Sequence, residues 1–141
     1  MANIENLLEV KTYTAAGYKP VIDFGAWRVA LMRSCTDCLP QNIKHFGCHD
    51  ETDEVFVLLQ GRCILFVADG HETIGTIHAQ DMEPGKVYNV KRSVWHSHTF
   101  DPDALVLIVE NRDTCGTNSR DCNLTTPQRK QVVDLTLKFW G

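Results

Sequence analysis

The chain has 141 residues, a formal net charge of −4 at pH 7, and basic residues that are scattered along the sequence. This charge distribution lacks the basic footprint of a nucleic-acid-binding protein, so we set that class aside. No apolar run reaches the length of a membrane span, and the first residues lack the basic and apolar regions of a signal peptide. We therefore expect one cytoplasmic domain over residues 1–141, long enough to bury roughly two thirds of its unfolded-chain surface without disulfides or a structural metal.

The N-terminal third of the chain predicts an arm followed by strands. Ile4, Leu7 and Leu8 are spaced for one face of a short helical turn, or of an arm that lies on the body. Residues 21–33 loosely alternate between apolar and polar side chains, which favours a strand. A loop over residues 35–41 then leads into a strand near 43–48.

The middle of the chain predicts many short strands. Residues 54–60 and 63–67 are rich in β-branched and aromatic side chains and flank Gly61-Arg62, which is a strong hairpin signal. Further strands are expected at 73–79, 86–90, 94–100 and 104–111, separated by turns that contain glycine, proline or aspartate. This spacing indicates a sandwich or barrel, with a barrel core at about residues 20–111.

The last part of the chain, residues 112–141, predicts a polar loop and one helix. The loop after the last strand either reaches over the barrel mouth to a polar ligand or forms a hydrogen-bonded turn. Thr126 can cap the helix, with Pro127 at its first position. Apolar residues are expected to pack the helix on the outside of the barrel or at a subunit contact, namely Val132, Val133, Leu135, Leu137, Phe139 and Trp140.

Ligand-type side chains lie on two of the predicted strands. Strand alternation places Glu54 at the start of a buried row with Phe56 and Leu58, and it places His96 and His98 on one shared face. A carboxylate or imidazole in such a row needs hydrogen bonds or a metal ion as partners. Two histidines and one carboxylate form a triad that holds Zn, Mn, Fe or Ni and leaves coordination positions open.

Residues 43–110 resemble the cupin family, within the RmlC-like jelly-roll superfamily. The first cupin motif runs from a histidine through four residues to a glutamate and through six more to a glycine, which His49, Glu54 and Gly61 match. The second motif resembles residues 90–96, which follow a Pro84-Gly85 turn. The resemblance implies an all-β double-stranded β-helix, or jelly-roll barrel, with a short N-terminal arm and one C-terminal helix.

The same resemblance implies a metal site and a homodimer. By the motifs, His49, Glu54 and His96 would be ligands of a divalent metal ion. The family usually carries another histidine two residues before the position of His49, where this chain has Gly47, and Lys91 and Ser93 replace a usual proline and glycine. His98, about 6–7 Å from His96 by strand rise, is a possible substitute for the missing ligand.

Two other interpretations of the polar residues stay open. The trio of His49, Glu54 and His96 could be a hydrogen-bonded polar core that keeps the strands in register. Cys35 and Cys38 have the two-residue spacing of zinc ribbons and redox motifs, and Cys115 and Cys122 could complete a four-thiolate site. The wide spacing of the second pair and the missing strand-to-helix context argue against both cysteine motifs. In the expected compartment all six cysteines would be reduced.

Two functions are compatible with these residues. One is a metal-dependent enzyme of the isomerase, lyase or oxygenase type, which acts on a small sugar-like or carboxylate-like metabolite by Lewis-acid chemistry. The alternative is a non-catalytic module or sensor that binds a small molecule with weak metal binding or none. No serine or cysteine nucleophile with a neighbouring base competes with the metal interpretation.

Overall fold

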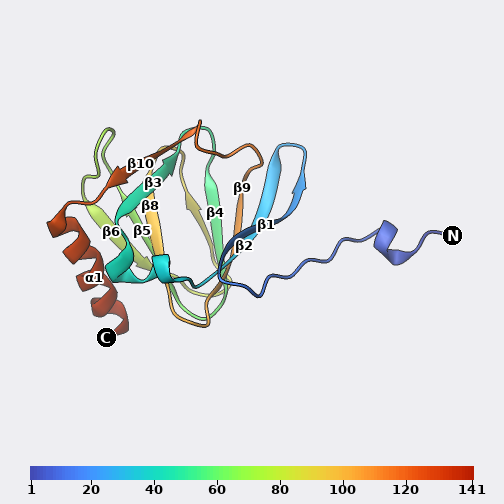
Figure 1. Cartoon of the computed structure of the whole chain (residues 1–141), viewed down its shortest axis with the longest axis horizontal. Helices are drawn as coiled ribbons and strands as arrows, with labels where there is room; N and C mark the ends of the chain where they lie inside the picture. The colour runs from blue at the N-terminus through green and yellow to red at the C-terminus, as the bar shows by residue number, and fades with distance from the viewer.

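Two antiparallel sheets of five strands each form the body of the protein in a computed structural model that describes residues 1–141 (Figure 1). The first sheet contains, in spatial order, β1 (Gly17–Phe24), β2 (Trp27–Arg33), β9 (Leu105–Asn111), β4 (Glu54–Gln60) and β7 (Val87–Val90). The second contains β10 (Ser119–Asn123), β3 (His45–His49), β8 (Trp95–Phe100), β5 (Cys63–Ala68) and β6 (Ile77–Asp81). One helix, α1 (Thr126–Trp140), and three short 3₁₀ turns, η1 (Ile4–Asn6), η2 (Thr36–Cys38) and η3 (Pro40–Asn42), complete the chain.

The structure therefore has the expected all-β jelly-roll architecture. Two strands flank Gly61 as expected, β4 and β5, but they belong to different sheets and do not pair, so the predicted hairpin is wrong. The N-terminal arm is also present, with its 3₁₀ turn at Ile4–Asn6, but it extends away from the barrel and does not lie on it (Figure 1). No helix in the structure is both long and apolar enough to cross a membrane.

Apolar side chains form two layers on either side of the second sheet. One layer fills the space between the sheets and includes Phe56, Phe100 and Ile108. The other lies between the outer face of the second sheet and α1, and it includes Phe66 and Val132. Both faces of β5 are therefore covered, which explains why its sequence is apolar without alternation.

Four elements differ from the sequence predictions. The strand expected over 73–79 is present only from Ile77 onward, as β6. The single strand expected over 21–33 is a hairpin of β1 and β2, because Gly25 adopts a left-handed φ of +59° at its turn. The loop expected over 112–125 contains β10, which pairs with β3 and extends the second sheet beyond residue 111. The helix is capped by Thr125 and not Thr126, in a capping box with Gln128.

Only some of the apolar side chains of α1 pack on the barrel. Val132 and Thr136 are buried, whereas Leu137 and Phe139 are exposed. The helix thus contacts the second sheet through a narrow stripe of side chains, and part of its apolar surface faces solvent.

Gly61 is required by the turn between β4 and β5. Its φ is +72°, and a Cβ at this position would lie 2.6 Å from the backbone nitrogen of Ala104. A residue with a Cβ in left-handed conformation loses about 1–2 kcal/mol even without a contact. Glycine is therefore needed here for both conformation and space.

We predict that Gly61→Ala lowers the free energy of unfolding by more than Gly85→Ala. Gly85 has a similar φ of +82°, but a Cβ added there would have no atom within 4 Å, so this position isolates the conformational cost. Urea denaturation of both variants measures the difference. Equal losses of stability would show that the contact with Ala104 has no effect.

Candidate metal centre

The Glu54 carboxylate lies between the two sheets, at the first residue of β4. Strand β4 pairs with β7 on one side and β9 on the other, and Glu54, Phe56 and Leu58 face the interior from it. Glu54 is only 7% exposed, as alternation along the strand predicted. A carboxylate at such a depth needs cationic or hydrogen-bonding partners.

Two imidazoles from the opposite sheet provide these partners. His49 ends β3 and His96 lies on β8, and the two strands are neighbours because Gly47 pairs with His96. The Nε2 atoms of His49 and His96 lie 2.9 Å and 3.0 Å from the same oxygen, Oε2 of Glu54. The donor atoms of the three residues all lie within 4.8 Å of one another. The structure thus brings together the trio that the motifs indicated.

The hydrogen bonding of His96 leaves its Nε2 as the free acceptor atom of the neutral ring, which could bind a metal ion. Nδ1 of His96 lies 3.0 Å from the carbonyl oxygen of Val94, which can only accept, so Nδ1 carries the hydrogen. The Nε2 lone pair of the neutral ring then faces the Glu54 carboxylate oxygen at 3.0 Å. Two lone pairs at this distance repel each other unless a cation, either a proton or a metal ion, lies between them.

The spacing of the donor atoms matches a metal site. Transition-metal ions hold imidazole nitrogen and carboxylate oxygen at about 2.0–2.2 Å, so neighbouring ligand atoms at a right angle are separated by about 3 Å. The two separations from Glu54 Oε2 are 2.9 Å and 3.0 Å. The donor set and its spacing therefore fit a divalent metal ion held by His49, Glu54 and His96.

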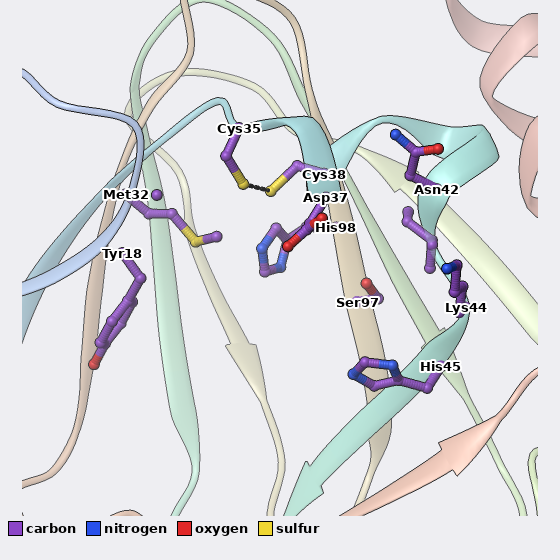
Figure 2. A pocket seen from close by; sticks show the side chains of 12 residues that line it. Tyr18, Met32, Cys35, Asp37, Cys38, Asn42, Lys44, His45, Ser97 and His98 are labelled. Atoms are coloured by element: carbon purple, nitrogen blue, oxygen red, sulfur yellow. Dashed lines mark hydrogen bonds between the residues drawn. The ribbon is translucent and has the colours of Figure 1, made fainter.

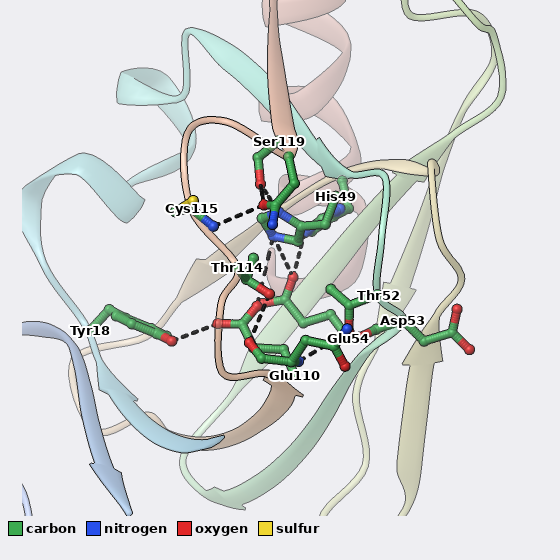
Figure 3. Close-up of polar contacts among 12 residues, drawn as sticks. Tyr18, His49, Thr52, Asp53, Glu54, Glu110, Thr114, Cys115 and Ser119 are labelled. Atoms are coloured by element: carbon green, nitrogen blue, oxygen red, sulfur yellow. Dashed lines mark hydrogen bonds and ion pairs between the residues drawn. The ribbon is translucent and has the colours of Figure 1, made fainter. Parts of the chain in front are cut away.

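A hydroxyl group orients the second imidazole. Nδ1 of His49 lies 2.7 Å from Oγ of Ser119, on β10, which is the strand that the sequence did not predict (Figure 3). This contact leaves Nε2 of His49 directed at Glu54. Hydrogen bonds of this kind to the second ring nitrogen fix the orientation of histidine ligands in metal sites.

The electrostatic environment keeps Glu54 ionised in the metal-free protein. Burial alone would raise its pKa, but hydrogen bonds and charge from His49 and His96 lower the pKa to about 2. The hydrogen bond to Glu54 raises the pKa of His49, against the effect of burial. Without a metal ion, the trio therefore behaves as an ion pair between a protonated histidine and the Glu54 carboxylate.

A second carboxylate lies beside the trio, and sequence reasoning missed it. Oε2 of Glu110, on β9, is 3.9 Å from Nε2 of His49, and its Oε1 accepts a hydrogen bond from the Tyr18 hydroxyl at 2.6 Å (Figure 3). The same Oε1 atom accepts hydrogen bonds from Arg28 at 2.7 Å and 3.1 Å. Arg28 also donates to the carbonyl oxygen of Thr114 at 3.2 Å. Alternation along β9 could have identified Glu110, because it shares the inward face with Val106 and Ile108.

A cavity with a volume of about 490 Å³ has Tyr18 of this network in its wall (Figure 2). Tyr18 lines the cavity and donates its hydroxyl hydrogen to Glu110, so one side chain connects the cavity wall to the group beside His49. None of the trio itself lines the cavity. Its wall is formed by residues of β1, β2, β3 and β8 together with the 35–45 segment, which include Cys35, Cys38, Lys44, His45 and His98.

His98 does not join the trio. Its ring packs between Phe56 and Phe100, with ring centroids 6.0 Å and 4.8 Å away, and it lines the cavity. Nδ1 of His98 is buried without a hydrogen-bond partner, and burial lowers its pKa to about 4, so the ring is neutral near pH 7. The predicted role of His98 as a fourth ligand is therefore not supported by convergence of donor atoms.

The cysteines do not form a four-thiolate site. Cys35 and Cys38 contact each other, whereas Cys115 makes a hydrogen bond with Thr117. The trio is the one group of three or more ligand-type side chains whose donor atoms converge. Cys48 and Cys63 are buried in the apolar layers. The structure therefore does not assemble the four-thiolate site, against which the spacing of the cysteines already argued.

Comparison with solved structures supports the jelly-roll fold. The chain is similar to CapF, a capsular polysaccharide assembling protein from Staphylococcus aureus, with a TM-score of 0.57 and 13% identity over 80% of this chain and 34% of CapF. It is also similar to Pac13, a nucleoside dehydratase, with a TM-score of 0.55 and 9% identity over 81% of this chain and 85% of Pac13. The chain thus spans about a third of the length of CapF.

At these identities the similarity establishes the fold alone. No protein-family model matches the sequence, and no curated protein sequence matches it. The jelly-roll barrel that the cupin motifs implied is confirmed, and the chemistry of the site depends on the residues of this chain.

We predict that the stability of the metal-free protein depends on pH through Glu54 and His49. The contribution of Glu54 is fully present above pH 4.5, its ordinary pKa, and is lost as the pH falls toward 2. The contribution of His49 is fully present below pH 6.5 and is lost as the pH rises through its elevated pKa. Together they stabilise the fold most between pH 4.5 and 6.5.

Urea denaturation with a chelator present, repeated across this pH range, checks the prediction. Glu54→Gln removes the charge and should flatten both sides of the profile. Glu72→Gln, at a carboxylate that is almost fully exposed, is the matched control and should keep the wild-type profile. A Glu54→Gln profile parallel to that of the wild type would contradict the assignment.

Proposed function

We propose that this chain is a metal-dependent enzyme that binds one divalent ion through His49, Glu54 and His96 and acts on a small polar metabolite. The observation that carries the proposal is the convergence of two Nε2 atoms on one buried carboxylate oxygen, at 2.9 Å and 3.0 Å. The Nδ1 hydrogen bond of His96 supports it, because it leaves the Nε2 lone pair facing that oxygen.

The type of ion follows from the donor atoms. Imidazole nitrogen and carboxylate oxygen suit Zn, Mn, Fe or Ni, and three protein ligands leave coordination positions for substrate or water. A bound ion of this kind supplies Lewis acidity, which stabilises an oxyanion on a carbonyl, enediol or water. Isomerisation, elimination or oxygen chemistry would each be compatible with such a site.

The cavity beside the trio supports a small-molecule substrate. Its volume of about 490 Å³ lies in the range of about 300–1,000 Å³ that is usual for small-molecule sites. Lys44, Asn42 and His45 contribute polar groups to its wall, and the buried Nδ1 of His98 has no partner within the chain. We propose that a sugar-like or carboxylate-like molecule in the cavity lies against the His98 ring and contacts these polar groups.

Tyr18 is proposed as the hydrogen-bond donor that links substrate and trio. Burial, and then its bond to Glu110, raise the pKa of Tyr18, so the phenol keeps its hydrogen at neutral pH. Arg28 holds Glu110 in place with two hydrogen bonds. The Tyr18 hydroxyl can therefore turn from Glu110 to a substrate while the Glu110 carboxylate keeps its position. This arrangement keeps a proton at the cavity wall and a carboxylate beside His49.

The alternative function is a binding or sensor module with weak metal binding. Gly47 favours it, since this residue lies two positions before His49 on the same strand face and offers no ligand atom. We also propose a homodimer, which the exposed apolar side chains of the N-terminal arm support, namely Ile4, Leu7, Leu8 and Val10.

We predict that the purified protein binds one equivalent of Mn, Fe, Ni or Zn near neutral pH and that Glu54→Ala abolishes this binding. Elemental analysis after metal loading and dialysis measures it, at a pH where ligand protonation does not compete. His45→Ala is the matched control, because His45 lies on the same strand face as His49 but outside the trio. It should retain the metal.

Two outcomes would contradict the prediction. Absence of metal in the wild type under every loading condition would exclude the enzyme and favour the binding module. Equal loss of metal in His45→Ala and Glu54→Ala would show that binding is not specific to the trio.

We further predict that Gly47→His tightens metal binding. An added Cβ at residue 47 would lie 3.2 Å from Oδ1 of Asp121, an exposed side chain that can move away. A fourth imidazole should lower the dissociation constant by about tenfold or more, which corresponds to about 1.4 kcal/mol. Competition with a chromophoric chelator measures the change, and unchanged affinity would mean that residue 47 does not reach the ion.

A further inference from the structure

Two thiols face each other at the wall of the cavity. Cys35 follows β2 and Cys38 ends η2, and their Sγ atoms are 2.8 Å apart (Figure 2). Both side chains line the cavity of about 490 Å³. The pair is separate from the trio, because neither cysteine contacts His49, Glu54 or His96 in the structure.

The backbone around the two thiols is held in place. The amide of Cys38 donates to the carbonyl oxygen of Cys35 at 3.0 Å, which closes the turn between them. Thr99 on β8 donates its hydroxyl hydrogen to the carbonyl oxygen of Cys38 at 2.6 Å, and Asn42 donates to that of Thr36 at 2.8 Å. The approach of the thiols therefore follows from a fixed turn and not from side-chain rotation alone.

The two thiols differ in their surroundings. Cys35 is half-buried and borders the cavity, whereas Cys38 is only 6% exposed. Burial, and then the neighbouring Cys35, raise the pKa of Cys38 to about 12. Cys35 is thus the thiol that a reagent in the cavity reaches first, and part of the effect on Cys38 disappears once Cys35 has reacted.

We propose that Cys35 and Cys38 form a reversible redox site that exchanges with low-molecular-weight disulfides. The Cys35 thiolate attacks one sulfur of the small disulfide, a mixed disulfide forms, and one small thiolate leaves. Cys38 then attacks the Cys35 sulfur after losing its proton to solvent, the intramolecular disulfide forms, and the second small thiolate leaves. Two electrons pass from the protein to the reagent, and the reverse exchange with two small thiols restores the dithiol.

The second step is favoured by position. The Sγ atom of Cys38 is already next to that of Cys35, so the displacement is intramolecular and the mixed disulfide is short-lived. The disulfide would link the end of β2 covalently to η2 at the cavity wall. The site is independent of the proposed metal chemistry, since it needs only the two thiols and the turn that holds them.

The test is a redox titration of the full-length protein in mixtures of reduced and oxidised glutathione. Free thiols are trapped with N-ethylmaleimide, and peptide mass spectrometry locates each product. We expect the wild-type peptide with Cys35 and Cys38 to lose two hydrogen atoms and to carry no glutathione, and dithiothreitol to reverse the change. Cys38→Ala should convert this loss into one glutathione on Cys35.

Two further variants keep the test decisive. Cys35→Ser, at the half-buried position, should leave Cys38 as a free thiol. This result would show that Cys35 attacks first, and it does not depend on the stability of Cys38→Ala. Cys122→Ala, at a cysteine outside the pair, should behave as the wild type. The proposal is overturned if wild-type Cys35 retains glutathione while Cys38 stays free, or if both remain thiols when exposed Cys115 is already modified.

Discussion

The structure depends on a buried carboxylate whose charge is compensated from the opposite sheet. Glu54 starts β4, in the first sheet, and both of its partners, His49 and His96, belong to the second. Removing a charge from water costs several kcal/mol unless partners replace the solvent, so this contact is favourable only when the sheets pack in one register. The same interaction therefore holds the sheets together at one end of the barrel and brings together three donor atoms that could hold a metal ion.

The groups around the trio extend this arrangement toward the cavity. Glu110 is fixed by Arg28 and receives the Tyr18 hydroxyl hydrogen, and Tyr18 in turn borders the cavity. His98 lies on the same wall with an unpartnered Nδ1. Polar groups line this wall, and a small polar ligand is proposed to lie against the His98 ring. Metal site and substrate site are thus proposed as neighbours that share Tyr18 and Glu110.

The sequence predicted the trio because strand alternation and motif spacing are local properties. Glu54 and His96 were expected on inward faces, and they are there. Sequence reasoning missed β10 because Ser119–Asn123 lacks apolar alternation and becomes a strand only by pairing with β3. The distance between His98 and the trio could not be predicted either, since it depends on how the two sheets close around Phe56 and Phe100.

Anomalous diffraction from crystals loaded with Mn or Zn tests the central claim most directly. The account predicts one strong peak bounded by Nε2 of His49, Oε2 of Glu54 and Nε2 of His96, at about 2.0–2.2 Å from each atom. A peak beside Cys35 and Cys38 instead, or no peak at the trio in a crystal that holds the metal elsewhere, would contradict it. In that case the trio would be a hydrogen-bonded polar core whose role is to keep the two sheets in register.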